Sequence, residues 1–96
     1  MLELRPVCEH CGRSLAANSE DAMICSFECT FCKECVEQIL QNVCPNCGGE
    51  FSRRPVRPLA MLDRYPATTL RLHHPVDLEK FAALLERYGK TAPRDR

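Results

Sequence analysis

Apolar residues in the first half of the chain follow two different periods. Ala22-Met-Ile-Cys25 comes after a polar turn at residues 18–21, and this arrangement indicates a short strand. From Cys35 onward the apolar positions are spaced three and four residues apart, as on one face of a helix. The residues of this face are Val36, Ile39, Leu40 and Val43. The first half is therefore predicted to contain a strand and a two-turn helix.

The second half contains one clear amphipathic helix. Residues 59–62 predict a single helical turn, and Thr69-Leu-Arg-Leu72 alternates as a short strand does. Asp77 can cap the helix that follows, and Gly89 suits the position just past its end. The apolar stripe of this helix consists of Leu78, Phe81, Ala82, Leu85 and Tyr88. We expect the stripe to pack on the first half or on a second copy of the chain.

A basic stretch interrupted by prolines, Arg53-Arg-Pro-Val-Arg-Pro58, separates the two halves. It can be neither a helix interior nor a central strand, because proline lacks the backbone N–H that both require. We therefore divide the chain into a module at 1–52, a linker at 53–58, a strand and helix segment at 59–89, and a flexible tail at 90–96.

Eight of the 96 residues are cysteines, which indicates either disulfides or metal ligands. The first residues contain no apolar run typical of a signal peptide, and no stretch approaches the roughly 20 apolar residues of a membrane span. We therefore expect a soluble protein of the reducing cytoplasm, where cysteines bind metal. The region from Cys8 to Cys47 is also close to the roughly 40 residues below which a domain needs such support.

The cysteines occur as four close pairs: Cys8-x2-Cys11, Cys25-x3-Cys29, Cys32-x2-Cys35 and Cys44-x2-Cys47. A Cys-x2-Cys turn brings two thiolates to adjacent corners of a tetrahedron around Zn²⁺, with Zn–S bonds of about 2.3 Å. Four pairs therefore predict two zinc ions. The spacing leaves two arrangements open. Sequential pairing joins Cys8, Cys11, Cys25 and Cys29, whereas crossed pairing joins Cys8, Cys11, Cys32 and Cys35.

One part of the sequence resembles a RING finger. The run Cys25-Ser-Phe-Glu-Cys29-Thr-Phe-Cys32-Lys-Glu-Cys35-Val-Glu-Gln-Ile-Leu, then Cys44-Pro-Asn-Cys47, is similar to the centre and end of that family. Cys29 stands where most RING fingers have histidine, while Phe31 and Pro45 match residues that many of them carry. The resemblance covers residues 8–47.

The RING resemblance implies a small zinc-stabilised α+β fold with a treble-clef-like cross-brace, followed here by a short strand and the amphipathic helix. It assigns Cys8, Cys11, Cys32 and Cys35 to zinc site one, and Cys25, Cys29, Cys44 and Cys47 to zinc site two. Cys32 and Cys35 would also gain from the exposed N–H groups at a helix start.

Over the whole chain, the opening Met1-Leu-Glu-Leu-Arg-Pro6, the eight cysteines and the Arg/Pro stretch resemble a family of short bacterial proteins of unknown function. This resemblance implies a bacterial cytoplasmic setting and no particular activity.

An iron–sulfur cluster is the alternative cofactor. Cys29-x2-Cys32-x2-Cys35 with a later Cys44-Pro45 resembles the cluster-binding run of bacterial ferredoxins. The eight residues before Cys44 depart from the three of that family, and the Cys8 and Cys11 pair would have no role. Zinc is therefore the preferred assignment.

The charges are divided between the halves although the net charge is zero. Residues 1–52 carry three Lys/Arg against eight Asp/Glu, and residues 53–96 carry ten against five. Each Zn²⁺ with four thiolates adds a charge of −2 to the acidic half. Docking of the second half on the first would bring opposite charges together.

A zinc ion with four thiolates has no open position for water, so we expect no catalytic residues. The favoured function is a protein–protein interaction or scaffolding module, with an unknown protein or a second copy as partner. A ubiquitin-ligase-like activity is an alternative that the RING resemblance suggests. Ligases of this kind usually place an aliphatic residue where this chain has Glu9 and His10, and many place a basic residue where it has Gly48.

Two further alternatives remain open at this stage. Arg53, Arg54 and Arg57 could contact nucleic acid, although no aromatic residues are interleaved with them. A redox or zinc sensor would release metal when thiolates oxidise, but the spacing singles out no cysteine for this role. Three histidines are spare ligand candidates that we expect to be solvated or turn residues: His10, His73 and His74.

Overall fold

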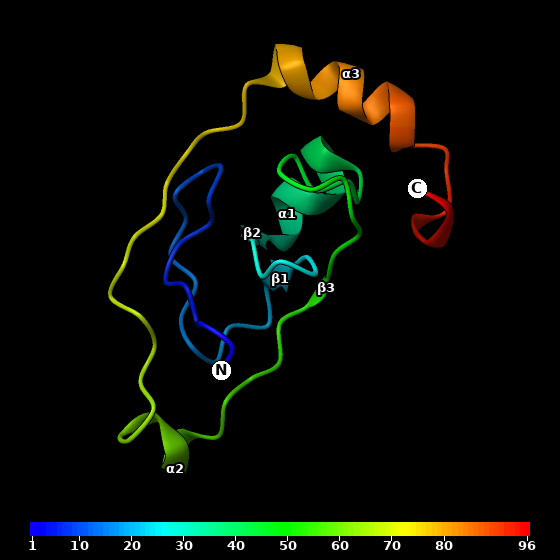
Figure 1. Cartoon of the computed structure of the whole chain (residues 1–96). Helices are drawn as coiled ribbons and strands as arrows, with labels where there is room; N and C mark the ends of the chain where they lie inside the picture. Colours follow the sequence, from blue (N-terminus) through cyan, green and yellow to red (C-terminus); the bar gives the residue numbers. More distant parts are fainter.

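The computed structural model describes residues 1–96 and has a small antiparallel sheet at its centre. The strands are β1 (Ala22–Ile24), β2 (Thr30–Cys32) and β3 (Ser52–Arg53), in the spatial order β2-β1-β3. Both neighbours of β1 are antiparallel to it. The predicted strand at residues 22–25 is confirmed to within one residue, and it is the central one (Figure 1).

The predicted helix follows β2 directly. It consists of α1 (Lys33–Cys35) and a π-helical continuation, η1 (Val36–Leu40). Gln41 and Asn42 then take left-handed backbone angles, with φ of 49° and 61°, which end the helix. The helix is therefore confirmed, although it ends before Val43, whose side chain is nevertheless fully buried.

One cluster of 13 buried residues connects the sheet, the helical segment and the cysteine pairs. Phe31 and Phe51 meet edge to face in it, with ring centroids 5.4 Å apart. Five of the 13 are cysteines, so thiols occupy positions that larger apolar side chains fill in other domains. The core is consequently small, and the α+β class is confirmed.

The predicted strand at Thr69–Leu72 is wrong. Residues 66–77, which we call the strap, form no helix or strand and run along the outside of the molecule (Figure 1). The N–H of Leu70 bonds locally to Thr68 Oγ1 at 3.2 Å, and the Leu70 side chain is 56% exposed. The third strand of the sheet comes instead from Ser52–Arg53, and residues 69–72 pair with none of the three strands.

Two helices flank the strap. The predicted helical turn at its start is confirmed as α2 (Leu59–Leu62). α3 (Leu78–Tyr88) begins at Asp77, whose Oδ1 accepts N–H groups of the first turn at 3.1 and 3.2 Å. Gly89 lies at the predicted end, although its φ of −60° is right-handed. None of the helices is long and apolar enough to cross a lipid bilayer.

The residues of α3 that pack on the core are only partly those of the predicted apolar stripe. Phe81 enters the core, and Leu84, Leu85 and Tyr88 pack against it. Leu78 and Ala82, by contrast, are exposed. The sequence places apolar residues on more than one face of this helix, and the docking surface selects among them.

The basic stretch and the tail both make contacts with the first half of the chain. Arg53 is part of β3, and Arg54 is 1% exposed. The tail contains a 3-10 turn, η2 (Pro93–Asp95). The Arg96 guanidinium donates to the carbonyls of Asn42 and Gly48 at 2.9 and 3.0 Å. The flexibility of residues 90–96 stays a prediction.

Candidate metal centre

The first cysteine pair lies in a tight knuckle. An isolated bridge between Val7 and Ser14 closes it, and the Cys8 N–H donates to the Arg13 carbonyl at 2.8 Å. Gly12 has a φ of 77°, a conformation that side chains with a Cβ rarely adopt. This turn brings Cys8 and Cys11 to the same side of the loop.

The third pair lies where β2 ends and α1 begins. Cys32 is the N-cap residue of α1, and its Sγ accepts the Cys35 N–H at 3.4 Å. Free N–H groups at a helix start stabilise negative charge. Burial nevertheless raises the pKa of Cys32, and the hydrogen bond from the Cys35 N–H opposes this increase.

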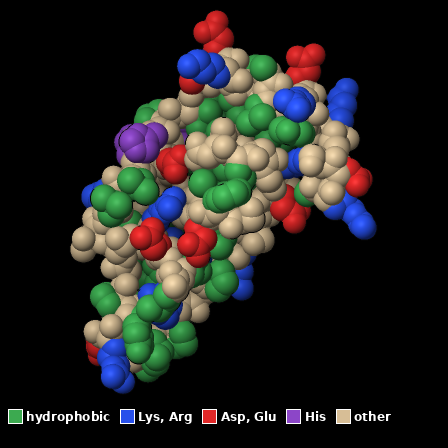
Figure 2. Space-filling view, viewed as in Figure 1, with side chains coloured by type: hydrophobic (Ala, Val, Ile, Leu, Met, Phe, Trp, Pro, Cys, Tyr) green, Lys and Arg blue, Asp and Glu red, His purple; other side chains and the backbone are tan.

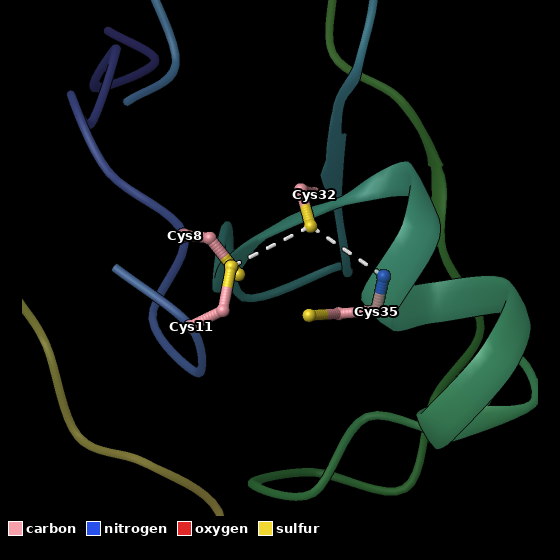
Figure 3. Close-up of side chains that lie close together, drawn as sticks. All are labelled: Cys8, Cys11, Cys32 and Cys35. Atoms are coloured by element: carbon pink, nitrogen blue, oxygen red, sulfur yellow. Dashed lines mark hydrogen bonds between the residues drawn. The ribbon is translucent and has the colours of Figure 1, made fainter. Parts of the chain in front are cut away.

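These two pairs form the first cluster. All four sulfur atoms of Cys8, Cys11, Cys32 and Cys35 lie within 4.8 Å of one another. Figure 3 shows the four side chains pointing toward one another from the knuckle and from the start of α1. Cys11 Sγ lies 3.8 Å from Cys32 Sγ. Four sulfurs at about 2.3 Å from a tetrahedral zinc would be about 3.8 Å apart. The donor set and its size therefore fit a zinc ion.

The second cluster is less tightly assembled. The sulfurs of Cys25, Cys44 and Cys47 lie within 4.8 Å of one another, and Cys29 Sγ lies outside that limit. Cys29 is still close to this cluster, because its thiol interacts with the Cys25 thiol and with the Asn46 side chain. The structure thus brings three of the four expected ligands together and leaves the fourth beside them.

Two backbone turns shape the second cluster. The Phe27 N–H donates to Cys25 Sγ, and the Gly49 N–H donates to Cys47 Sγ, both at 3.4 Å. Gly48 has a φ of 79°, as Gly12 has in the first knuckle. N–H groups directed at sulfur stabilise thiolates, so these turns suit metal binding.

The clusters correspond to crossed rather than sequential groups of sulfurs. Cys8 and Cys11 converge with Cys32 and Cys35 across the intervening pair, not with Cys25 and Cys29. The ferredoxin-like run is also divided, because Cys29 is separate from the group that holds Cys32 and Cys35. All eight cysteines are free, and two groups of them are positioned to bind metal ions.

The pKa values of Cys35 and Cys8 in the first cluster are shifted in opposite directions. It raises the pKa of Cys35 well above the ordinary thiol value, and the neighbouring Cys32 and Cys8 thiols add to this increase. Burial also acts to raise the pKa of Cys8, but N–H groups of Cys11, Cys32 and His10 outweigh it and lower that pKa. Metal binding must therefore displace a proton from Cys35, and displacing one from Cys8 costs less free energy.

Burial similarly raises the pKa of Cys44 in the second cluster, although N–H groups of Asn46 and Cys47 oppose it. The pKa of Cys29 is raised by burial and by the Cys25 thiol, and the Asn46 side chain opposes the increase. Protons must leave these thiols too before four charged sulfurs can surround a cation.

The histidines hold the strap rather than join a cluster. His10 Nδ1 accepts the Val76 N–H at 2.9 Å, and His73 Nε2 lies 3.1 Å from the His10 carbonyl oxygen. The His74 N–H donates to the Glu9 carbonyl at 2.8 Å. The strap is therefore fixed to the loop between Cys8 and Cys11, a contact that no sequence pattern signalled.

Glu9 and Asn46 link the two knuckles. Asn46 Nδ2 donates to Glu9 Oε2 at 2.8 Å, and Arg5 lies 3.9 Å from the other carboxylate oxygen. Glu9 is nearly buried, and with Pro45 and Phe81 it lines a cleft of about 280 Å³ beneath the strap and α3. The face between the two knuckles is thus covered by the chain's own C-terminal segment.

Comparison with known proteins gives a family but no activity. The family model described as "Protein of unknown function (DUF1272)" matches residues 1–57. A protein of Rhizobium meliloti (strain 1021) described as uncharacterized is 61% identical over 75 residues. These residues are 78% of this chain and 89% of the relative. No solved structure matches the chain.

Proposed function

We infer that this chain, which belongs to the DUF1272 family of proteins of unknown function, is a non-catalytic protein-interaction module stabilised by two zinc ions. The observation that carries this proposal is the first cluster, where four sulfurs within 4.8 Å of one another could supply all four ligands of a tetrahedral zinc ion. Zinc held in this way supplies structural stability and leaves no coordination position for a substrate.

The second site would be completed by Cys29. Its thiol already interacts with that of Cys25, so a side-chain movement toward Cys44 and Cys47 gives the fourth ligand. The crossed grouping, with α1 starting at the third pair, supports a RING-like cross-brace.

A partner-binding surface is available at the α2 end of the molecule. Figure 2 shows apolar side chains gathered at that end, over α2. Met1, Leu59 and Met61 are exposed there, Leu59 by 73% of its surface. Arg64 and Tyr65 line a hollow beside Met1. Apolar residues rimmed by arginine are typical of a protein interface, and they suit a partner that presents apolar and acidic side chains.

Two observations favour this function over the alternatives. Arg54 and Arg57 donate to backbone carbonyls at 2.7–2.9 Å, so their guanidiniums are already engaged within the chain and less suited to nucleic acid. The strap and α3 cover the loops containing Glu9 and Pro45, which a RING ligase would need for a conjugating enzyme. Both support a binding module without catalysis.

Replacing Leu59 with glutamate is expected to weaken partner binding at least about tenfold, because the charge enters the apolar centre of the interface. Immobilised wild type and variants are compared for the proteins that they retain from a bacterial extract, and the retained protein is then titrated against each. The matched control is Leu78→Glu, an exposed leucine on α3 that should leave binding unchanged.

Three outcomes would contradict the proposal. One is equal binding by the Leu59 and Leu78 variants. Another is binding of duplex DNA or RNA with an affinity that falls steeply with salt. The third is discharge of a thioester-loaded conjugating enzyme by the wild-type chain.

A further inference from the structure

The eight cysteines differ in their access to solvent. Cys11 and Cys47 are exposed, Cys29 is half-buried, and the other five are buried. The two exposed residues are equivalent in position, since each is the second cysteine of a knuckle. Reaction of a thiolate with a dissolved oxidant requires access, so Cys11 and Cys47 are the cysteines most open to direct attack.

Hydrogen bonding distinguishes the two exposed sulfurs. Cys47 Sγ accepts the Gly49 N–H at 3.4 Å. Cys11 Sγ has no backbone N–H bonded to it, and its neighbours are the other sulfurs of the first cluster, with Cys32 Sγ at 3.8 Å. An N–H group directed at sulfur withdraws charge from a thiolate and makes it less nucleophilic. Cys11 is therefore the exposed sulfur with the least protection.

A second cysteine lies close enough to complete the reaction. Cys32 Sγ is 3.8 Å from Cys11 Sγ, and a dashed line marks this contact in Figure 3. A disulfide needs the two atoms about 2.0 Å apart. Cys32 Sγ is also held in place, because it accepts the Cys35 N–H at 3.4 Å. We propose that Cys11 is a modification site at which a peroxide starts formation of a Cys11–Cys32 disulfide.

The chemistry balances with hydrogen peroxide as the oxidant. The Cys11 thiolate attacks one peroxide oxygen, an S–O bond forms, the O–O bond breaks, and the departing hydroxide takes a proton to become water. The Cys32 thiolate then attacks Cys11 Sγ, an S–S bond forms, and the hydroxide that leaves is protonated to a second water. The two sulfurs lose two electrons, which reduce one peroxide.

This oxidation would remove two of the four ligands of the first cluster. Two neutral disulfide sulfurs replace two thiolates, so the site loses both donors and negative charge. The knuckle that contains Cys11 also carries the strap through His10, so its loosening would release the strap. The second cluster retains its ligands in this first step.

The test uses the full zinc-loaded chain, whose metal content is measured first. One equivalent of hydrogen peroxide is added, remaining thiols are alkylated, and the disulfides are mapped by peptide mass spectrometry. We expect a Cys11–Cys32 disulfide as the first product, with one zinc released per disulfide. A first disulfide within the second cluster, or oxidation spread evenly over all eight cysteines, would overturn the proposal.

A Cys11→His variant separates reactivity from folding. Histidine keeps a ligand atom for zinc but cannot form a sulfenic acid. Peroxide-driven zinc release from the first cluster should slow at least about tenfold in this variant. Release from the second cluster of the same molecule is the internal control and should not change. If the variant releases zinc from the first cluster as fast as wild type does, Cys11 is not the site.

Discussion

Replacing Cys35 with alanine is expected to leave the module formed by residues 1–52 unfolded in the reduced protein. The buried Cys35 thiol is part of the first cluster and of the core. Structural zinc contributes roughly 10–16 kcal/mol in small zinc-dependent domains. The whole stability of a domain is about 5–15 kcal/mol, so loss of one ligand removes most of it. Circular dichroism and NMR dispersion measure this loss.

The matched control for Cys35→Ala is Ser26→Ala, at an exposed position beside Cys25 that has no side-chain hydrogen bond. This change should alter stability by less than about 0.5 kcal/mol. A Cys35→Ala chain that folds and melts as the control does would mean that the first cluster is not a structural metal site.

Replacing Arg54 with alanine is expected to destabilise the metal-loaded protein by about 3 kcal/mol. The guanidinium is 1% exposed and donates to the carbonyls of Arg5 and Ala16 at 2.8 and 2.9 Å. Its removal leaves a cavity. It also removes two charge-assisted hydrogen bonds that connect the residue after β3 to the loops containing Arg5 and Ala16. Burial lowers the pKa of Arg54, and relief of this desolvation offsets part of the loss. Urea unfolding with saturating zinc measures the difference.

Arg53→Ala is the matched control for Arg54→Ala, because the Arg53 side chain is exposed and makes no hydrogen bond. It should change stability by less than about 0.5 kcal/mol. If both variants unfold at the same urea concentration as wild type, the buried role of Arg54 is wrong. If both instead lose affinity for nucleic acid, the arginines belong to a nucleic-acid surface.

Local patterns predicted the elements that depend on neighbouring residues. The strand at 22–25, the helical turn at 59–62 and the cap at Asp77 all follow from spacing or from one side chain. The cysteine spacing predicted two groups of sulfurs, but it left the pairing open. The RING resemblance implied the crossed grouping, in which the structure places the sulfurs of Cys8, Cys11, Cys32 and Cys35.

Features that depend on distant residues could not be predicted in this way. The alternation at Thr69–Leu72 predicted a strand, yet a strand also needs a partner strand beside it, and the strap pairs with none of the three strands. Arg54 lies in a basic run that indicates an exposed surface, and only the fold reveals the carbonyls that bury it. The phase of α3 is likewise set by the surface that receives Phe81.

The contacts between the two halves could not be predicted from their net charges either. Opposite net charges of the two halves predicted an electrostatic contact between them. The ion pairs of the structure nevertheless all lie within residues 3–34. The second half is attached by apolar packing of α3 and by arginines that donate to carbonyls. The composition therefore predicted the sign of the net charge of each half, but not the contacts that join the halves.

Two-dimensional NMR of the reduced, metal-stripped protein tests most directly whether metal–thiolate bonds replace the missing interior of the first half. We expect the resonances of residues 1–52 to lose their dispersion when the metal is removed and to recover it when two equivalents of zinc are added. Dispersed resonances that persist without metal, with all eight thiols reduced, would contradict this expectation.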